Sequence, residues 1–252
     1  MIPKARALRL PDIVLRHALT HPTGMLTVPM AEQLPDELPK GYYFDQYHTG
    51  PQWNFWTADD RVSNSLPFVT CPFLVGETRW VQEAWRVGAV DGDRGCIAID
   101  YRADGHARRE WLRVEDNDRF LRLWEDISRD ASAGGYTRAD GSFSWEPGQG
   151  PGRWRSASTL SQPWSRLAVQ ITAIRGHRRD LFTESDYDAI AHGISDLVMQ
   201  PNGQLLTTEG WLPSVALDLA WDLAYAGRGL SCAARPWVWT VGYTVVVPEV
   251  RA

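Results

Sequence analysis

The sequence predicts an α+β fold built around a mixed, barrel-like sheet. Apolar and polar residues alternate in four separated stretches, near residues 78–87, 96–101, 165–175 and 237–247, as they do in half-buried strands. Apolar residues at helical spacing occur between these stretches. The strands and helices do not alternate as in a βαβ fold, and the chain has no GxGxxG motif. We expect residues 1–252 to form a single domain.

The first of these strands follows a turn at Gly76 and carries an unusual acidic residue. Alternation places Val81, Glu83 and Trp85 on one face, which is apolar apart from the carboxylate. A buried carboxylate needs a cation, hydrogen-bond donors or a proton, because removing its charge from water is costly. Two interpretations of Glu83 follow: a structural partner of an arginine such as Arg166, or a functional carboxylate.

The chain before this strand predicts a helix and a long aromatic segment, which together make up residues 1–70. Residues 11–20 predict a short helix with a proline at an early position. Residues 21–72 predict an irregular stretch with a short strand at 26–28. Because the region 42–56 is too aromatic for a linker, we interpret it as a structured loop packed on the domain.

The remaining elements surround the other strands. Residues 115–130 have the apolar stripe of a docked helix, and residues 132–153 are rich in Gly, Ser and Pro, as exposed loops are. We interpret about 106–152 as an insertion of a helix and a loop. The basic run Arg175–Arg179 is interpreted as a solvated turn. Capping patterns predict further helices, and their expected ranges are 183–193 and 214–226.

The net charge and the tryptophan content indicate which kind of ligand site the protein could have. The net charge of −5 and the pI near 5.7 argue against a groove that tracks a long phosphate backbone. They favour a pocket for a nucleotide, a modified nucleobase or a short single-stranded nucleic acid. The 13 tryptophans suit core packing and also stacking on bases.

Targeting and metal signals are weak in this sequence. The three cysteines are widely spaced without CxxC, and the six histidines lack metal-ligand spacing, so we expect no disulfide framework, metal or cofactor. No apolar run approaches the ~20 residues of a membrane span, and the N-terminus lacks a signal-peptide pattern. We therefore expect a cytoplasmic protein without a membrane partner.

Six strings of residues, in one order, resemble a group of phage and prophage proteins in the ASCH branch of the PUA-like superfamily. These strings are Cys71–Phe73 with Gly76–Trp85, Tyr101–Gly105, Trp154–Arg166, Leu181–Gly193, Leu219–Asp222 and Pro236–Trp239. The resemblance covers about residues 71–247. It implies a PUA-like mixed β-barrel flanked by helices, a role in RNA or nucleotide recognition, and a location in the cytoplasm of the host cell if the protein is phage-encoded.

The sequence departs from the enzymatic members of that superfamily. Small amidohydrolases that act on acylated cytidine share a "GRKTxTxR" motif, together with a glutamate from a later helix. The stretch that corresponds to the motif, His21–Val28, contains threonines but no lysine, and the position of the glutamate is closest to His192. A catalytic site in this protein would have to use other residues in place of the motif lysine and the helix glutamate. Our candidate pair is Glu83 with His192.

Several residues are candidates for binding a ligand. A guanidinium at Arg166, next to Ser165, could hold a phosphate or a carboxylate, or could pair internally with Glu83. Four tryptophans could form a stacking floor for a base, although two of them are expected to be core: Trp80, Trp85, Trp154 and Trp164. Tyr101 and Arg102 end a strand at a turn, where they could bind a ligand or stabilise the turn.

Three function classes therefore remain. The first is a nucleotide-binding or nucleic-acid-binding module, which is the interpretation we favour. The second is a hydrolase that acts on a modified nucleobase or nucleoside. The third is a phage protein that uses the aromatic 42–56 segment to bind a host protein.

Overall fold

The computed structural model describes most of the chain, and all structural statements below refer to the described residues. These are residues 6–10, 12–34, 42–46, 51–57, 68–104, 109–134, 143–145, 149–184, 187, 190, 197–199, 205–207 and 213–246. The chain divides into two compact units. Unit 1 comprises Met1–Arg6, Arg16–Arg79 and Leu167–Ala252, and unit 2 comprises Ala7–Leu15 and Trp80–Arg166. Each unit is described by itself, so the single domain expected from the sequence stays a prediction.

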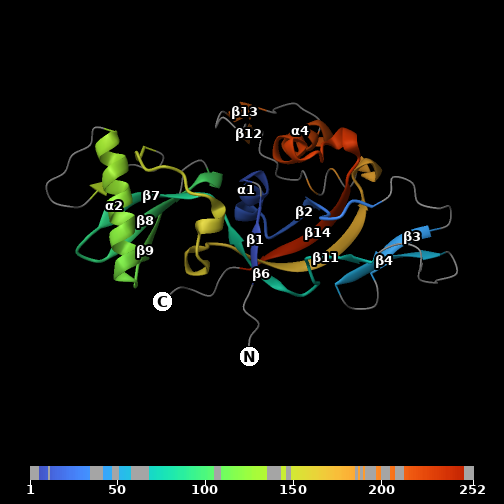
Figure 1. Ribbon diagram of the computed structural model, residues 1–252, viewed down its shortest axis with the longest axis horizontal. Coiled ribbons are helices and arrows are strands. Elements are labelled where there is room, and N and C mark those ends of the chain that lie inside the picture. Colours follow the sequence, from blue (N-terminus) through green and yellow to red (C-terminus); the bar gives the residue numbers. More distant parts are fainter. Residues whose placement is uncertain are drawn as a thin grey trace. The chain divides into compact units, whose positions relative to one another are not determined.

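The fold is α+β, as the sequence predicts, with strands in four sheets (Figure 1). A five-stranded sheet has the order β1 (Arg6–Arg9), β6 (Thr78–Gln82), β11 (Ala168–Arg178), β14 (Trp237–Val246) and β2 (Thr23–Pro29). A four-stranded sheet has the order β10 (Phe143–Ser144), β7 (Trp85–Asp91), β8 (Cys96–Tyr101) and β9 (Arg109–Arg113). The smaller sheets are β3 (Tyr42–Gln46), β4 (Gln52–Thr57) and β5 (Val69–Thr70), and the pair β12 (Leu197–Met199) and β13 (Leu205–Thr207).

The described helices are α1 (Asp12–Thr20), α2 (Asn117–Ala133) and α4 (Pro213–Tyr225). All three were predicted from the sequence to within a few residues. The helix predicted at 183–193 lies mostly outside the described residues. Short 3-10 turns link the other elements: Arg102–Asp104, Ala157–Thr159, Gln162–Trp164, Arg179–Leu181, Ala226–Arg228 and Cys232–Ala234.

The prediction that the four alternating stretches share one sheet is wrong. The stretch at 78–87 is two strands, because β6 ends at Gln82 and β7 begins at Trp85 in the other large sheet. Alternation continues through Glu83 and Ala84, so the pattern alone cannot show that the chain changes sheets there. β8 lies beside β7, whereas β11 and β14 lie in the sheet of β6. Among the described strands no sheet closes into a barrel, since both large sheets have end strands.

The segment interpreted as an insertion contributes to the four-stranded sheet. It supplies β9 and β10, which flank β8 and β7, together with α2. Helix α2 begins after Asp116, whose carboxylate caps the backbone N–H of Arg119. Its apolar side packs on the sheet through Phe120, Leu123 and Ile127. The core of unit 2 therefore lies between α2 and β7, β8 and β9.

The aromatic segment near 42–56 belongs to the core of unit 1. It forms β3 and β4, and not the irregular loop expected from the sequence. Phe44 lies 5.5 Å and 5.9 Å (ring centroids) from Trp237 and Trp239 of β14. Trp53 and Phe55 of β4 are buried. These rings pack against β14, so core packing accounts for part of the unusual aromatic content.

The basic run Arg175–Arg179 is not a solvated turn. Its first four residues continue β11, where they pair with β14 as far as Trp237. Arg179 is buried, and its Nη2 donates to Asp218 Oδ1 of α4 at 2.5 Å. Its guanidinium lies 4.5 Å from the ring centroid of Phe182 and 5.3 Å from that of Trp221. Contact with these aromatic rings offsets the cost of removing the Arg179 cation from water. The charge pattern of the sequence does not show that these rings lie beside it.

Gly176 allows the aromatic rings to approach β11 closely. A Cβ at this position would lie 2.5 Å from a ring carbon of Phe44 and 2.8 Å from one of Trp239. We therefore expect Gly176→Ala to lower the free energy of unfolding by about 1–3 kcal/mol. Gly227→Ala is the matched control, because its Cβ would meet no atom within 4 Å. Urea unfolding of both variants measures the difference, and equal stabilities would contradict the packing described here.

Candidate functional site

Glu83 and Arg166 form a buried, two-point ion pair in unit 2. Arg166 Nε donates to Glu83 Oε1 at 3.0 Å, and Arg166 Nη2 donates to Oε2 at 2.8 Å. The carboxylate side chain is 0% exposed and the guanidinium 7%. The contact expected for the structural interpretation of Glu83 is thus present. Because both carboxylate oxygens accept from one arginine, the geometry resembles a structural pair more than an accessible acid or base.

Tyr101 and Ser165 hold this ion pair in place. The Arg166 guanidinium carbon lies 4.2 Å from the ring centroid of Tyr101, which is itself fully buried. The Tyr101 hydroxyl donates to the Trp164 carbonyl at 2.7 Å, and Ser165 Oγ donates to the Val81 carbonyl at 2.7 Å. These polar groups, predicted as ligand contacts, instead bind the segment 164–166 to the strands beside it.

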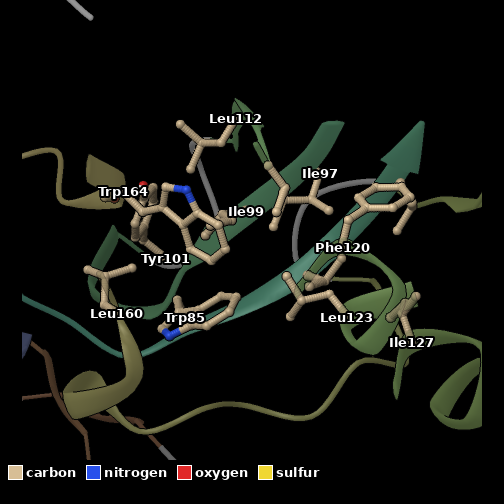
Figure 2. Packing of buried hydrophobic residues seen from close by; sticks show 13 residues of the cluster. Trp85, Ile97, Ile99, Tyr101, Leu112, Phe120, Leu123, Ile127, Leu160 and Trp164 are labelled. Carbon is tan, nitrogen blue, oxygen red and sulfur yellow. Dashed lines mark hydrogen bonds between the residues drawn. The ribbon is translucent and has the colours of Figure 1, made fainter. Parts of the chain in front are cut away.

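Two of the four candidate tryptophans are core residues, as the sequence suggested for half of them. Trp85 and Trp164 are 2% and 5% exposed, and their rings meet edge-to-face with centroids 5.5 Å apart. Figure 2 shows both among the aliphatic side chains of the core. Trp85 Nε1 donates to Thr159 Oγ1 at 3.0 Å. The stacking floor of four tryptophans is therefore not assembled, because these two rings are already packed.

The other predicted site residues lie at more accessible positions or outside the described chain. Trp80, Arg102 and Trp154 are half-buried. The Arg102 backbone N–H donates to the Ala84 carbonyl at 3.0 Å, which stabilises the turn after β8. His192 lies outside the described residues, so its proposed partnership with Glu83 stays a prediction.

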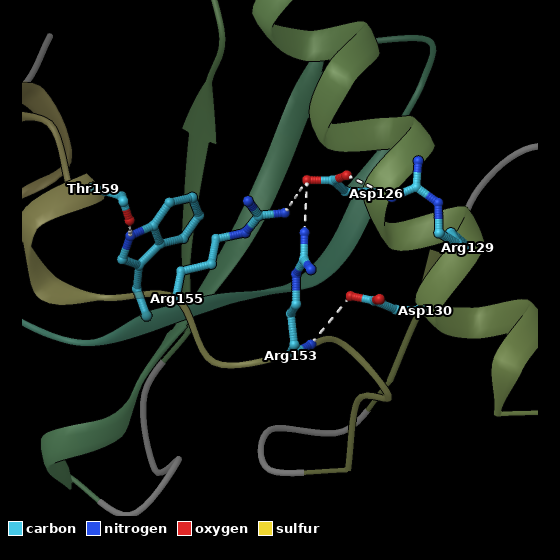
Figure 3. Close-up of polar contacts among 7 residues, drawn as sticks. Asp126, Arg129, Asp130, Arg153, Arg155 and Thr159 are labelled. Carbon is cyan, nitrogen blue, oxygen red and sulfur yellow. Dashed lines mark hydrogen bonds and ion pairs between the residues drawn. The ribbon is translucent and has the colours of Figure 1, made fainter.

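A cluster of arginines around Asp126 forms a partly exposed charged site in unit 2 (Figure 3). Arg155 Nη2 donates to Asp126 Oδ2 at 2.8 Å, and Arg153 Nη2 lies 3.6 Å from the same oxygen. Arg129, one turn along α2, has its Nη1 3.3 Å from Asp126 Oδ1. The side chains of Arg129 and Arg153 are 69% and 63% exposed, whereas that of Arg155 is half-buried. We call these four residues the Asp126 cluster.

Two elements position the cluster. Helix α2 presents Asp126 and Arg129 beside its buried residue Ile127. The segment 149–156 runs along β7, held by mutual backbone hydrogen bonds between Trp85 and Arg155 (2.8 Å and 3.4 Å). Gly152 makes this path possible, since a Cβ there would lie 2.8 Å from the Val87 carbonyl oxygen. The backbone N–H of Arg153 donates to Asp130 Oδ2 at 3.2 Å, which ties the segment to the helix.

The electrostatics of the cluster are dominated by its cations. The hydrogen bond from Arg155 lowers the pKa of Asp126, and the charges of Arg155, Arg153 and Arg129 add to this effect against the opposing effect of burial. Three guanidinium groups surround the Asp126 carboxylate, and the Asp130 carboxylate accepts from the backbone N–H of Arg153. These five groups together carry a charge of +1, three positive and two negative, although the chain carries −5.

Trp154 lies between the two arginines of the segment but contacts a different neighbour. Arg86 of β7 has its guanidinium carbon 4.6 Å from the Trp154 ring centroid, and its Nη1 donates to the Gly150 carbonyl at 3.0 Å. Trp154 thus contacts Arg86 of β7, whereas Arg153 and Arg155 reach Asp126 of α2. Arg86 Nε also lies 3.5 Å from Asp100 Oδ2 on the neighbouring strand β8. Trp154 therefore packs on Arg86, which is buried and forms an ion pair with Asp100.

Sequence reasoning found Trp154 but missed the arginines beside it. The i, i+3 spacing of Asp126 and Arg129 on a predicted helix was visible, and so was the run Arg153-Trp154-Arg155. What the sequence could not show is that the segment 149–156 lies against α2, because that contact joins residues about thirty positions apart.

The described residues show no metal-binding cluster, no reactive thiol at Cys71 or Cys232 and no membrane-spanning helix. In the described ranges, no group of three or more His, Cys, Asp and Glu residues could hold a metal ion. Burial raises the pKa of the Cys71 thiol to about 11 and that of Cys232 to about 12, so neither forms a thiolate at neutral pH. None of the described helices is long and apolar enough to cross a membrane.

No protein-family model, no curated protein and no solved structure matches the chain. The resemblance to the ASCH branch consequently stays a prediction.

Proposed function

We propose that this protein binds a short single-stranded nucleic acid, or a nucleotide of the same chemistry, through the Asp126 cluster in unit 2. The observation that carries the proposal is the convergence of three guanidinium groups on one carboxylate, with two of the three largely exposed. The proposal agrees with what the resemblance to the ASCH branch implies, and includes RNA as the ligand and the cytoplasm as the location.

The cluster has more donors than its carboxylate can satisfy. Asp126 bonds well to Arg155 at 2.8 Å, but the contacts of Arg129 and Arg153 are long, at 3.3 Å and 3.6 Å. Each guanidinium carries five N–H donors in a planar fork that suits the oxygens of a phosphate. A phosphate placed between Arg129 and Arg153 would accept from both without displacing the bond between Arg155 and Asp126.

Trp154 suits the base of the same ligand. It is half-buried and supported by Arg86, so its ring is held in one orientation. Since Trp154 contacts β7 and the two flanking arginines contact Asp126 of α2, a ligand that binds both must extend from one contact to the other. A strand of two or more nucleotides can do so more readily than a mononucleotide, which favours the short strand. Stacking of one base contributes about 1–3 kcal/mol.

The other two function classes gain less support. The hydrolase requires Glu83 as an acid or base, yet this carboxylate is buried and bonded at both oxygens to Arg166. The host-protein interpretation requires accessible aromatic residues in the 42–56 segment, yet Trp53 and Phe55 are buried in the core of unit 1.

Charge removal at the cluster tests the proposal. We expect the double variant Arg129→Gln/Arg153→Gln to weaken binding of a labelled short single strand by about 100-fold or more, because each of the two charged hydrogen bonds contributes about 1.5–3 kcal/mol. Both side chains are exposed, so the variant should fold normally. Fluorescence anisotropy at fixed salt measures the dissociation constant.

A second double variant, Arg94→Gln/Arg122→Gln, is the matched control, since it removes the same charge from two exposed arginines outside the cluster. Its affinity should stay near that of the wild type. An equal loss in both double variants would show that binding reflects net charge and not the Asp126 cluster. Absence of binding in the wild-type protein would overturn the proposal outright.

A further inference from the structure

Strand β9 is an end strand of the four-stranded sheet, whose order is β10-β7-β8-β9 (Figure 1). It pairs with β8 along its whole length, from Arg109 opposite Asp100 to Arg113 opposite Cys96. In the part of the chain that the structure describes, no strand pairs with its outer side. An end strand of this kind offers backbone groups for pairing with another chain.

The direction of the backbone groups in β9 can be deduced from one hydrogen bond. The N–H of Val114 donates to the Gly95 carbonyl at 3.0 Å, so Val114 points its backbone groups toward the β8 side. Backbone groups alternate between the two sides along an antiparallel strand. Leu112 therefore also points toward β8, whereas the N–H and C=O of Trp111 and Arg113 point outward.

The side chains of β9 alternate as well. Leu112 and Val114 are buried in the core of unit 2. On the other face, Trp111 is 54% exposed and Arg113 is exposed. Trp111 lies opposite Ala98, which is fully buried although Trp111 is not. A large aromatic side chain and a cation thus lie two residues apart on an end strand.

We propose that β9 pairs antiparallel with β9 of a second copy of this chain, with Leu112 on the two-fold axis. This register places Trp111 opposite Arg113 of the second copy, twice by symmetry, on the exposed face. The outward backbone groups of these two residues are those that such a pair exchanges as hydrogen bonds. The indole and the guanidinium then form cross-strand cation–π pairs.

The charges along β9 select this register. Pairing centred one residue earlier, on Trp111, would place Arg109 opposite Arg113 of the second copy, and like charges directly opposite are unfavourable. Pairing centred on Leu112 avoids that contact and joins the two sheets into one of eight strands. The interface is isologous, as most homodimer interfaces are. A dimer formed in this way goes beyond the proposed nucleic-acid binding and does not depend on it.

Oligomeric state and charge-specific variants test the pairing. In sedimentation-velocity runs from micromolar to near-millimolar protein, we expect a species of twice the 28.4 kDa chain mass to grow with concentration. Trp111→Lys places a cation opposite Arg113 of the second copy and should raise the dimer dissociation constant by about tenfold or more. Trp111→Glu places an anion there and should retain more dimer than Trp111→Lys does.

Both variants change an exposed side chain, and matching thermal melts confirm that they fold. A monomer at every concentration would overturn the proposal, and so would a dimer that both variants leave unchanged. If the protein is monomeric and Trp111→Lys instead weakens binding of a single strand, the exposed face of β9 is a base-stacking surface and the dimer is excluded. Strand binding by the Arg129→Gln/Arg153→Gln variant is measured separately, so failure of one proposal does not decide the other.

Discussion

Replacing Glu83 by glutamine should lower the free energy of unfolding by about 3–5 kcal/mol, the range for breaking a buried ion pair by removing one partner. The variant keeps the size of the side chain but removes the negative charge that Glu83 places beside the Arg166 guanidinium, which is 7% exposed. The second hydrogen bond, from Arg166 Nη2 to Oε2, has no equivalent acceptor in an amide. Urea unfolding followed by tryptophan fluorescence measures the change.

Two companion variants make this result specific. Glu125→Gln, on the exposed side of α2, makes the same chemical change and should leave stability within about 0.5 kcal/mol of the wild type. Glu83→Leu/Arg166→Met removes both charges and should be more stable than either single replacement, because no uncompensated charge stays buried. If Glu83→Gln melts like the wild type and abolishes turnover of a nucleoside substrate, Glu83 is a functional carboxylate and the structural interpretation is wrong.

Trp164→Ala should destabilise the protein by about 3–5 kcal/mol, as expected for truncating a large buried aromatic side chain. The ring is 5% exposed and meets Trp85 edge-to-face. The Arg119 guanidinium carbon lies 3.7 Å from its ring centroid, so that the cation also loses its contact. The sequence suggested that Trp164 binds a base, and this variant separates that role from packing.

Trp80→Ala is the comparison variant. Because Trp80 is half-buried, truncating it should lower the free energy of unfolding less than truncating Trp164 does. Differential scanning calorimetry gives both melting temperatures, and the anisotropy titration gives both affinities at a temperature where each variant is folded. A Trp164→Ala protein with unchanged melting temperature and lost strand binding would restore Trp164 as a ligand contact.

Local patterns predicted much of the secondary structure. The boundaries of β8 at Cys96–Tyr101 match the prediction, and α1, α2 and α4 lie where their apolar spacing placed them. The ion-pair alternative for Glu83 also followed from one acidic residue on an apolar face. These features depend on neighbours within a few residues, which is the range over which hydrophobic periodicity carries information.

The arrangement of strands could not be predicted in the same way. Nothing in the alternation around Glu83 and Ala84 distinguishes one continuous strand from two strands in different sheets. The aromatic residues of β3 and β4 were assigned to a loop, because their partners Trp237 and Trp239 lie nearly two hundred residues away. The Asp126 cluster was missed for the same reason, since Arg153 and Arg155 meet Asp126 through tertiary packing alone.

The salt dependence of strand binding tests whether a short strand binds at the Asp126 cluster. Anisotropy titrations of a labelled short single strand with the wild-type protein, at several salt concentrations, give the slope of log affinity against log salt. Binding at the Asp126 cluster with one stacked base involves the phosphate between Arg129 and Arg153 and at most one neighbouring phosphate, which predicts a slope of about −1 and binding that survives a few hundred millimolar salt. A slope several times steeper would contradict this, because it would show that an extended basic surface tracks the backbone. Absence of binding at the lowest salt would contradict the claim entirely.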